Sequence, residues 1–509
     1  MTIRSPLTRV STLGLVAIGS ALCIGAVSAC ASEDQGNDGW WNGGKSGAAG
    51  AAGAPSSSDA PSQGGASSQD AGKTPSDAGK GGAAGKGGAG GASGGAGAQT
   101  GGAGGSVPAE DVASAPEQPA FLGLDEHCKL ISDRNIDDPT PNDTHHRANL
   151  RGTDLGISVA HGNDLYFFFG DTAGAQGIWP LGPESLPDAV GYSAQPYSAV
   201  AKDPSLLCSN LRFLLTGGKT GNVQGDFAGT SMQPPPGHSI AEFIHNPAGP
   251  RGQNVFPNLP GDFEVPSGAF SFGGSLYVFY TTVNLDPFEM QGSYLAKWDT
   301  PSKGGKPDYR ILYQVDQRFD SHGQLRGNFV NIAAMVEPPY VYLYGTGKYR
   351  ASPVHLARKL LSTLDTPGGF ESYEALTGTW GPADALAAPV VVMPAIGELS
   401  VQHFPAINRY VMMDAEPLGI IARFADKPEG PWSTGVSVAS MADPLFALKY
   451  CCINNDCIGE RLLNCDRAGF YGTYMLPDVI VNTDGSFSIP FTMSTWDPYN
   501  VALMTAKFK

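Results

Sequence analysis

The sequence predicts an all-β domain behind a long low-complexity tether, and three observations lead to this prediction. Hydrophobic runs of about four to eight residues, rich in β-branched and aromatic residues, recur in the C-terminal part, while long segments of helical periodicity are nearly absent. Of the 68 glycines, 25 lie between residues 31 and 107, and no aromatic residue occurs between Trp41 and Phe121. The net charge of -16, with only 16% charged residues, argues against nucleic-acid binding.

Residues 1–29 have the composition of a bacterial export signal, with Arg4 and Arg9 ahead of an apolar run. The run ends in Val27-Ser28-Ala29-Cys30, which resembles the lipobox of bacterial lipoproteins. Cys30 is therefore predicted to be the lipidated first residue of the mature chain, anchored to a membrane. The alternatives are an ordinary signal with Cys30 incidental, or a transmembrane helix.

Residues 30–118 form the tether, which consists mainly of Gly, Ala and Ser. Such a segment cannot bury enough apolar surface to offset the entropy of ordering it, so we expect a disordered linker. The expected location is therefore outside the cytoplasm, as a membrane-anchored lipoprotein of the bacterial cell envelope or surface. Residues 119–509 form the folded domain.

The folded domain contains an even number of cysteines, which in an exported chain favours disulfides. Four of them lie between residues 451 and 465 and predict a stapled surface loop. A zinc site is the alternative, but adjacent cysteines match no standard zinc-finger spacing. The pairing stays open, and so does metal binding by His145-His146 beside Asp143. The six cysteines are Cys128, Cys208, Cys451, Cys452, Cys457 and Cys465.

A pair of strands recurs along the domain. The first members are predicted at residues 165–170, 276–280, 341–344, 410–413 and 487–491. The second members are predicted at residues 197–201, 293–297, 354–358, 419–423 and 500–504. Each first member has an apolar anchor residue, namely Phe168, Phe279, Leu343, Met412 and Phe491.

Five similar units favour a five-bladed β-propeller over two β-sandwiches in tandem, because radial packing of blades protects the sheet edges. The first two anchors are the farthest apart, which predicts an insertion at about residues 174–262. The last strand ends at the C-terminus, so we expect a segment from residues 121–150 to close the ring by joining the final blade.

The first unit contains two aspartates at matching positions of a predicted hairpin. Asp154 and Asp171 are equally distant from a turn centred between Gly162 and Asn163, so they are expected to lie directly opposite each other. Two like charges there destabilise a sheet, whereas paired carboxyl groups suit glycosidic hydrolysis, one as acid and one as base or nucleophile. The alternative is that both carboxylates accept backbone hydrogen bonds in ordinary turns.

Several motifs together resemble the family called domain of unknown function 4185. They are Gly152-Thr-Asp-Leu-Gly156, Phe169-Gly-Asp-Thr172, Gly345-Thr-Gly-Lys-Tyr-Arg350 with Leu356-Ala-Arg358, Gly397-Glu-Leu-Ser-Val401, Gly430-Pro-Trp-Ser433 and Ser494-Thr-Trp-Asp-Pro-Tyr-Asn500. The family is similar to five-bladed propeller glycosidases, and some members are described as endo-D-arabinanases. The resemblance implies that Asp154 and Asp171 are the catalytic pair, with inversion at the anomeric carbon, and leaves open which is the acid.

Other units supply further candidates. Glu398 is predicted as a third carboxylate in the central cleft, with a plain strand-edge role as the alternative. Arg350 is predicted to bind a sugar hydroxyl or to keep an aspartate ionised, with a structural salt bridge as the alternative. Aromatic residues that suit stacking on sugar rings, unless they belong to the core, are Trp179, Tyr192, Tyr474 and Trp496.

The sequence thus predicts a surface-tethered glycoside hydrolase that acts on an arabinan-like polysaccharide. The alternative is a noncatalytic carbohydrate-binding or adhesion propeller. No organic cofactor is expected, and a structural metal ion on the propeller axis stays open. The expected partners are the polysaccharide and, through the lipid anchor, a membrane. No nucleic-acid partner is expected, and the protein is expected to be a monomer.

Overall fold

The computed structural model describes most of the predicted domain. Several predictions lie outside the described residues: the export signal, lipidation of Cys30, the tether up to residue 114, the cysteines at 451–465, Trp179 and Trp496. Within the described part of the chain, no helix is both long enough and apolar enough to cross a membrane. The described residues are 115–131, 141–148, 150–174, 188–214, 243–244, 259, 261, 263–285, 287–303, 309–317, 327–417, 419–440, 442–443, 469–495 and 499–509.

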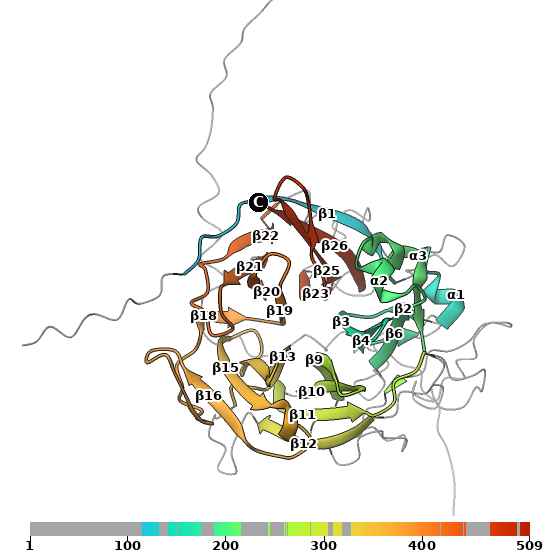
Figure 1. The fold of residues 1–509 in the computed structure, drawn as a ribbon. Coiled ribbons are helices and arrows are strands. Elements are labelled where there is room, and N and C mark those ends of the chain that lie inside the picture. The colour runs from blue at the N-terminus through green and yellow to red at the C-terminus, as the bar shows by residue number, and fades with distance from the viewer. Residues whose placement is uncertain are drawn as a thin grey trace, which may run out of the picture. The chain divides into compact units, whose positions relative to one another are not determined.

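Five antiparallel sheets of the described residues surround a common axis, as Figure 1 shows. Each inner strand contacts the inner strands of both neighbouring sheets, and the fifth contacts the first, so the ring is closed. The fold is the predicted five-bladed β-propeller, with blades numbered here in chain order. The inner strands are β3 (Leu155–His161), β9 (Phe263–Phe272), β13 (Asn331–Glu337), β19 (Leu399–Phe404) and β23 (Phe470–Met475).

Each blade adds three strands outward from its inner strand. The second strands are β4 (Asp164–Asp171), β10 (Ser275–Leu285), β14 (Tyr340–Thr346), β20 (Arg409–Glu416) and β25 (Phe487–Thr495). The third strands are β6 (Asp188–Ser193), β11 (Phe288–Trp298), β15 (Ser352–Leu360), β21 (Gly419–Ala425) and β26 (Asn500–Phe508). The fourth strands are β7 (Leu211–Phe213), β12 (Tyr309–Gln317), β16 (Phe370–Glu374), β22 (Val436–Ser440) and β1 (Phe121–Lys129).

Short elements extend this plan. The strands are β2 (Leu150–Gly152) paired with β5 (Ala173–Gly174), β8 (Phe243–Ile244) on β6, β17 (Thr379–Pro382) on β16, β18 (Val391–Ile396) on β15 and β24 (Ile480–Val481) on β25. The helices are α1 (Thr144–Ala148), α2 (Tyr197–Val200), η3 (Pro204–Leu206), α3 (Leu207–Asn210) and η4 (Leu361–Thr363). Elements β6 to β8 lie in the predicted insertion.

The predicted strand pairs are the second and third strands of the blades, and one prediction is wrong. Residues 197–201 form helix α2 and its end rather than a strand, and the third strand of blade 1 is β6. Pro196, whose φ angle is fixed by its ring, begins a turn. The Pro196 carbonyl accepts hydrogen bonds from the N–H groups of Ala199 and Val200. This local hydrogen bonding overrides the apolar alternation of the segment.

The second strands are hydrophobic on both faces because each is packed between two neighbouring blades. In β4, Tyr166 and Phe168 belong to a core cluster that includes Val278 of blade 2. The alternate residue Phe167 belongs to a different cluster, which includes Leu503 of blade 5. Burial of both faces explains why the sequence of β4 is a continuous apolar run instead of an alternating pattern.

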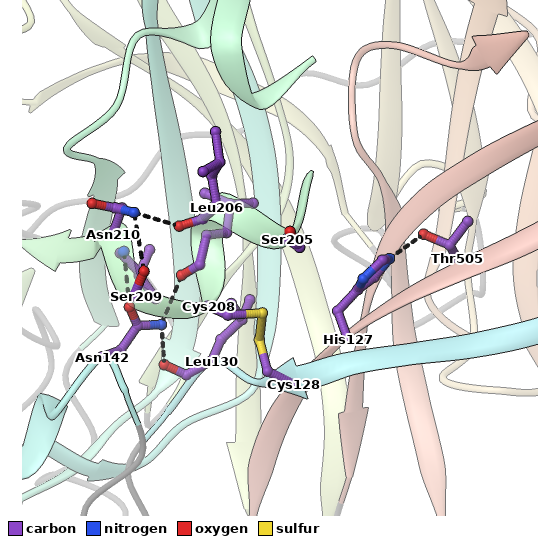
Figure 2. The surroundings of a disulfide bond; sticks show 12 residues. His127, Cys128, Leu130, Asn142, Ser205, Leu206, Cys208, Ser209, Asn210 and Thr505 are labelled. Carbon is purple, nitrogen blue, oxygen red and sulfur yellow. Dashed lines mark hydrogen bonds between the residues drawn. A yellow bond between two sulfur atoms is a disulfide. The ribbon is translucent and has the colours of Figure 1, made fainter. Parts of the chain in front are cut away.

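The N-terminal strand closes the ring, as predicted. Strand β1 pairs with β26 from Phe121 opposite Phe508 to Lys129 opposite Ala502. A disulfide joins Cys128 of this strand to Cys208 in α3, so it links the first and last blades across the closure (Figure 2).

A buried asparagine reinforces the same junction. The side chain of Asn142 donates to the carbonyls of Leu130 (3.0 Å) and Leu207 (2.9 Å) and accepts the N–H of Leu211 (3.0 Å). Figure 2 shows it beside the disulfide, where it holds the end of β1, α3 and β7 together.

Candidate active site

The starts of the inner strands meet at one end of the propeller axis, and a polar residue stands at four of them. Asp154 directly precedes β3, Glu264 is the second residue of β9, Asn331 opens β13 and Glu398 directly precedes β19. All four are buried. Strand β23 of the fifth blade contributes Tyr471 at the same level.

A cavity of about 610 Å³, open to solvent, lies at this end of the axis. Its lining combines carboxyl groups, one guanidinium and three tyrosines with apolar side chains, a composition typical of ligand sites. The polar and tyrosine residues of the wall are Asp154, Asp171, Asn331, Tyr349, Arg350, Glu398, Tyr471 and Tyr474.

The β3–β4 hairpin turns at Gly162 and Asn163 as predicted, but the two aspartates are not directly opposite each other. A β-bulge at Gly156 shifts the register, so the N–H of Gly170 donates to the Asp154 carbonyl (3.2 Å). Asp171 instead lies opposite Asp188 of β6. The prediction of direct opposition failed because a bulge inserts one unpaired residue and redirects the side chain beside it.

Two backbone features set the position of Asp154. Leu155, the next residue, has a φ of 62° in the left-handed region, which is strained for a side chain of this size. Its N–H donates to Ser494 Oγ of blade 5 (2.7 Å), which holds this conformation. On the facing strand, a Cβ at Gly170 would overlap Asp154 Oδ1, so glycine leaves the space that the carboxyl group occupies.

Asp154 is nearly buried but has partners that favour its ionised form. Tyr471 Oη donates to Asp154 Oδ2 (2.9 Å). Burial is the largest influence and raises the pKa of Asp154 to about 7, and the charge of Glu398 adds to this. The hydrogen bond from Tyr471, the nearby hydroxyl group of Tyr499 and the charge of Arg350 act in the opposite direction and keep that pKa from rising further.

Asp171 has the opposite surroundings. Burial raises the pKa of Asp171 well above its ordinary value, and the nearby charge of Asp154 raises it further. Its Oδ1, like that of Asp154, has no hydrogen-bond partner among the described residues. Tyr499 Oη donates to the backbone carbonyl of Asp171 (2.8 Å) and so fixes the end of β4.

Two further buried carboxyl groups stand behind Asp171, and the sequence analysis did not predict them. Asp188 and Glu264 are each only 2% exposed. Both Asp188 oxygens and Glu264 Oε2 lack hydrogen-bond partners among the described residues. Burial is the largest influence and raises the pKa of each well above its ordinary value. The charge of Glu264 raises the pKa of Asp188 further, and the charge of Asp171 raises the pKa of Glu264 further.

Arg350 and Glu398 form an ion pair at the side of the cavity near Asp154. Arg350 Nη2 lies 3.1 Å from Glu398 Oε1 and 3.2 Å from Oε2. The guanidinium lies 4.8 Å from the ring centres of both Tyr349 and Tyr471. These contacts orient a permanent positive charge toward the Asp154 side of the cavity.

The structure brings together most of the predicted site residues that it describes. Asp154, Asp171, Glu398, Arg350 and Tyr474 all line the cavity. Tyr192 does not. It packs against the core between blades 1 and 2, with Lys303 Nζ 5.8 Å from its ring centre.

A sequence signal for the missed residues exists in the repeat itself. Glu264 and Asn331 stand at the start of the first strand of their units, as Asp154 and Glu398 do. Asp188 carries a weaker signal, as a lone acid at the start of a short apolar strand. The repeat is most evident in the second strands, which do not include these starts.

The arrangement can support acid–base chemistry. Two carboxyl groups at one cavity have environments that favour different protonation states, which is how paired carboxyl groups acquire separate roles. Oxygen ligands of this kind also suit Ca²⁺ or Mg²⁺. In the described residues, no group of three or more His, Cys, Asp or Glu side chains has an arrangement that could hold a metal ion.

Comparison with known proteins identifies a family and a group of similar folds. A family model described as Domain of unknown function (DUF4185) matches residues 139–505. No curated protein matches the sequence.

Similar solved structures include an α-L-arabinofuranosidase from Podospora anserina in complex with cellotriose, 10% identical, covering 76% of this chain and 98% of that chain at a TM-score of 0.39. The catalytic domain of a GH62 α-L-arabinofuranosidase from Coprinopsis cinerea is 11% identical and covers 77% of this chain and 98% of that chain at a TM-score of 0.39. An arabinanase from Bacillus subtilis is 12% identical and covers 70% of this chain and 96% of that chain at a TM-score of 0.33. At these identities and TM-scores, the similarities carry no argument about activity.

Proposed function

We propose that this chain, which belongs to the family described as Domain of unknown function (DUF4185), hydrolyses glycosidic bonds with Asp154 and Asp171 as its acid–base pair. One observation carries the proposal: both carboxyl groups line the same open cavity, but among the described residues hydroxyl donors and a cation act on Asp154 and not on Asp171. Such divergence separates a proton donor from a proton acceptor at one pH.

The surroundings of the two carboxyl groups support a different role for each. Asp171 keeps its proton and is the general acid, which gives that proton to the glycosidic oxygen as the C–O bond breaks. Asp154 ionises at a pH of about 7 and is the general base. It takes a proton from a water molecule whose oxygen attacks the anomeric carbon. In this proposal the reaction inverts the anomeric configuration, because water attacks directly from the opposite side.

The proposed substrate is an arabinan-like polysaccharide outside the cell, since the family resemblance implies a furanose polymer. Tyr349, Tyr471 and Tyr474 provide rings and hydroxyl groups for sugar contacts, and the Glu398–Arg350 pair provides a fixed charge. The lipobox-like sequence at Cys30 supports a lipid-anchored location.

The test is release of reducing ends from a panel of arabinans and related furanose polymers. Asp154→Asn and Asp171→Asn should each lower the rate by about 10²- to 10⁴-fold, the usual contribution of a general acid or base. The matched control is Asp164→Asn at the other end of β4, where the carboxylate forms a partly exposed ion pair with Lys303 (2.6 Å). It should hydrolyse at the wild-type rate.

Two outcomes would reject the proposal. Undiminished activity in both site variants would remove the assigned roles. Saturable glycan binding by the wild type without any product, unchanged by either substitution, would make the protein a carbohydrate-binding propeller. Proton NMR of the first-formed sugar tests inversion separately, because a product of retained configuration contradicts direct attack by water.

A further inference from the structure

The three carboxyl groups at the inner end of blades 1 and 2, Asp171, Asp188 and Glu264, are here called the axial acid cluster. They come from three elements: the end of β4, the start of β6 and the start of β9. Asp171 and Asp188 are cross-strand neighbours in the β4–β6 ladder. Such neighbours have Cα atoms about 4.5–5.5 Å apart and project their side chains to the same side.

The cluster is buried, and no cation is among the described groups that act on it. Asp171 is 7% exposed, while Asp188 and Glu264 are each 2% exposed. The charged groups that act on the three are other carboxyl groups: Asp154, Asp171 and Glu264. Arg350 acts on Asp154, and Tyr499 contacts the end of β4 through the Asp171 carbonyl.

Ionised carboxylates in such a place cost far more free energy than neutral ones, so buried acids without a counter-charge retain their protons. Asp171 is the most exposed of the three and the only one that lines the cavity, so it is the first to give up its proton. Asp188 and Glu264 are deeper and stay neutral, and a neutral carboxylic acid can donate a hydrogen bond.

We propose that Asp188 and Glu264 are held as neutral carboxylic acids that donate hydrogen bonds to Asp171 while it transfers its proton to the leaving group. The proposal rests on the proposed function. When Asp171 protonates the glycosidic oxygen, it becomes a buried carboxylate that its own strand does not stabilise. No donor among the described residues satisfies either Asp188 oxygen, and Asp188 is the cross-strand neighbour of Asp171, so the two side chains project to the same side of the ladder. Asp188 and Glu264 are thus positioning residues, which act through Asp171 and do not touch the substrate.

The first test uses substitutions that separate neutral donation from negative charge. Asn at position 188 and Gln at position 264 are neutral donors, whereas Leu and Met of similar size cannot donate. We expect Asp188→Asn and Glu264→Gln to keep kcat within about threefold of the wild type. Asp188→Leu and Glu264→Met should lower kcat by about 10- to 100-fold, the range for a hydrogen bond to a charged group, with little change in KM.

The pH profile gives a second readout that a merely structural role would not move. Loss of a donor makes the Asp171 carboxylate less stable, so the pKa of Asp171 rises and the alkaline limb of kcat/KM moves to higher pH in Asp188→Leu. An alkaline limb at the wild-type pH, or an Asp188→Asn variant as inactive as Asp188→Leu, would overturn the proposal. The second result would mean that a negative charge is required, as in a cation site, and restoration of wild-type activity by Ca²⁺ after chelation would lead to the same conclusion.

Infrared spectroscopy tests the protonation without any activity. The difference spectrum between the wild type and Asp188→Asn/Glu264→Gln at pH 7 should contain the stretch of protonated carboxyl groups. The control Asp484→Asn removes an exposed carboxyl group whose pKa is lowered by hydrogen bonds from Ser486, so it should remove a carboxylate band instead. A carboxylate band from the double variant would overturn the proposal. A protonated band in a protein that hydrolyses no glycan would show that the proposed function, and with it the catalytic role of the cluster, is wrong.

Discussion

Two sets of buried carboxyl groups among the described residues differ in whether a cation lies within the set. In blade 4, Arg423 donates to both Asp414 and Glu416, and Asp414 is completely buried. In the axial acid cluster, Asp171, Asp188 and Glu264 face one another without a cation among the groups that act on them. A paired buried charge is compatible with a structural role, whereas buried acids without a counter-charge reduce stability and call for a functional explanation.

The largest expected effect comes from substitution of one acid in each place. Asp171→Asn should lower glycan hydrolysis by about 10²- to 10⁴-fold, because the variant has no proton to donate to the leaving oxygen. Its thermal midpoint at pH 7 should equal or exceed that of the wild type, since the substitution removes a buried ionisable group. Asp414→Asn should hydrolyse at a rate close to the wild type and melt at a lower temperature. If Asp414→Asn lost activity and Asp171→Asn lost only stability, the assignment of a functional role to the cluster and a structural role to blade 4 would be wrong.

The cation of blade 4 is the next target. Arg423→Met leaves two acids without their partner and should lower the free energy of unfolding by about 3–5 kcal/mol, as measured by chemical denaturation. The matched control is Arg310→Met, which removes a surface ion pair with Asp299 and should cost about 0–1 kcal/mol. Equal losses in the two variants would mean that burial does not distinguish these ion pairs.

The dependence of stability on pH should come from the buried carboxyl groups at the cavity and from Asp414 of blade 4, because burial raises the pKa of Asp414 to about 7 as well. A carboxyl group whose pKa is raised on folding stabilises the folded state by binding its proton. That stability is fully present below the unfolded pKa and is lost as pH rises through the folded pKa. For Asp154 the window is from 3.8 to about 7, and it extends to higher pH for the axial acid cluster.

We therefore expect the free energy of unfolding to fall by a few kcal/mol between pH 4 and pH 8, since a rise from 3.8 to about 7 corresponds to roughly 4 kcal/mol for one uncoupled group. Denaturation curves across this range measure it. Asp188→Asn/Glu264→Gln should give a flatter profile than the wild type. Stability that rises with pH in the wild type would contradict the absence of a counter-charge in the cluster.

The fold was predictable where burial leaves a clear pattern in the sequence. Second strands such as β4 are apolar on both faces because two blades cover them, and all five were located from this signal. Inner strands carry less signal, and single positions in them admit only glycine because the neighbouring blade approaches closely. A Cβ at Gly268 of β9, for example, would overlap the Ile332 carbonyl of the neighbouring blade.

The site was predictable only in part. Asp154 and Asp171 belong to one hairpin, so their proximity follows from a turn, although the bulge that separates their registers depends on the left-handed Leu155. Glu264 shares its position at the start of an inner strand with Asp154 and Glu398, whereas Asp188 looks in the sequence like an ordinary polar residue at a strand start. Their convergence with Asp171 depends on how blades 1 and 2 pack, which no local pattern encodes.

The smallest expected effect concerns the hydroxyl groups around Asp154. Tyr471→Phe removes the donor to Asp154 Oδ2 and leaves the ring against Arg350, so the pKa of Asp154 should rise by about one unit. The acid limb of kcat/KM then moves to higher pH, and activity at pH 6 falls about tenfold. Tyr474→Phe is the control, because its hydroxyl lines the same cavity and has no partner among the described residues. Its acid limb should stay in place, and any effect should fall on KM.

A shift of the same size in both variants would mean that the hydroxyl groups change the polarity of the cavity in general. An unmoved acid limb in Tyr471→Phe alone would mean that Asp154 is not the base whose ionisation the profile reports.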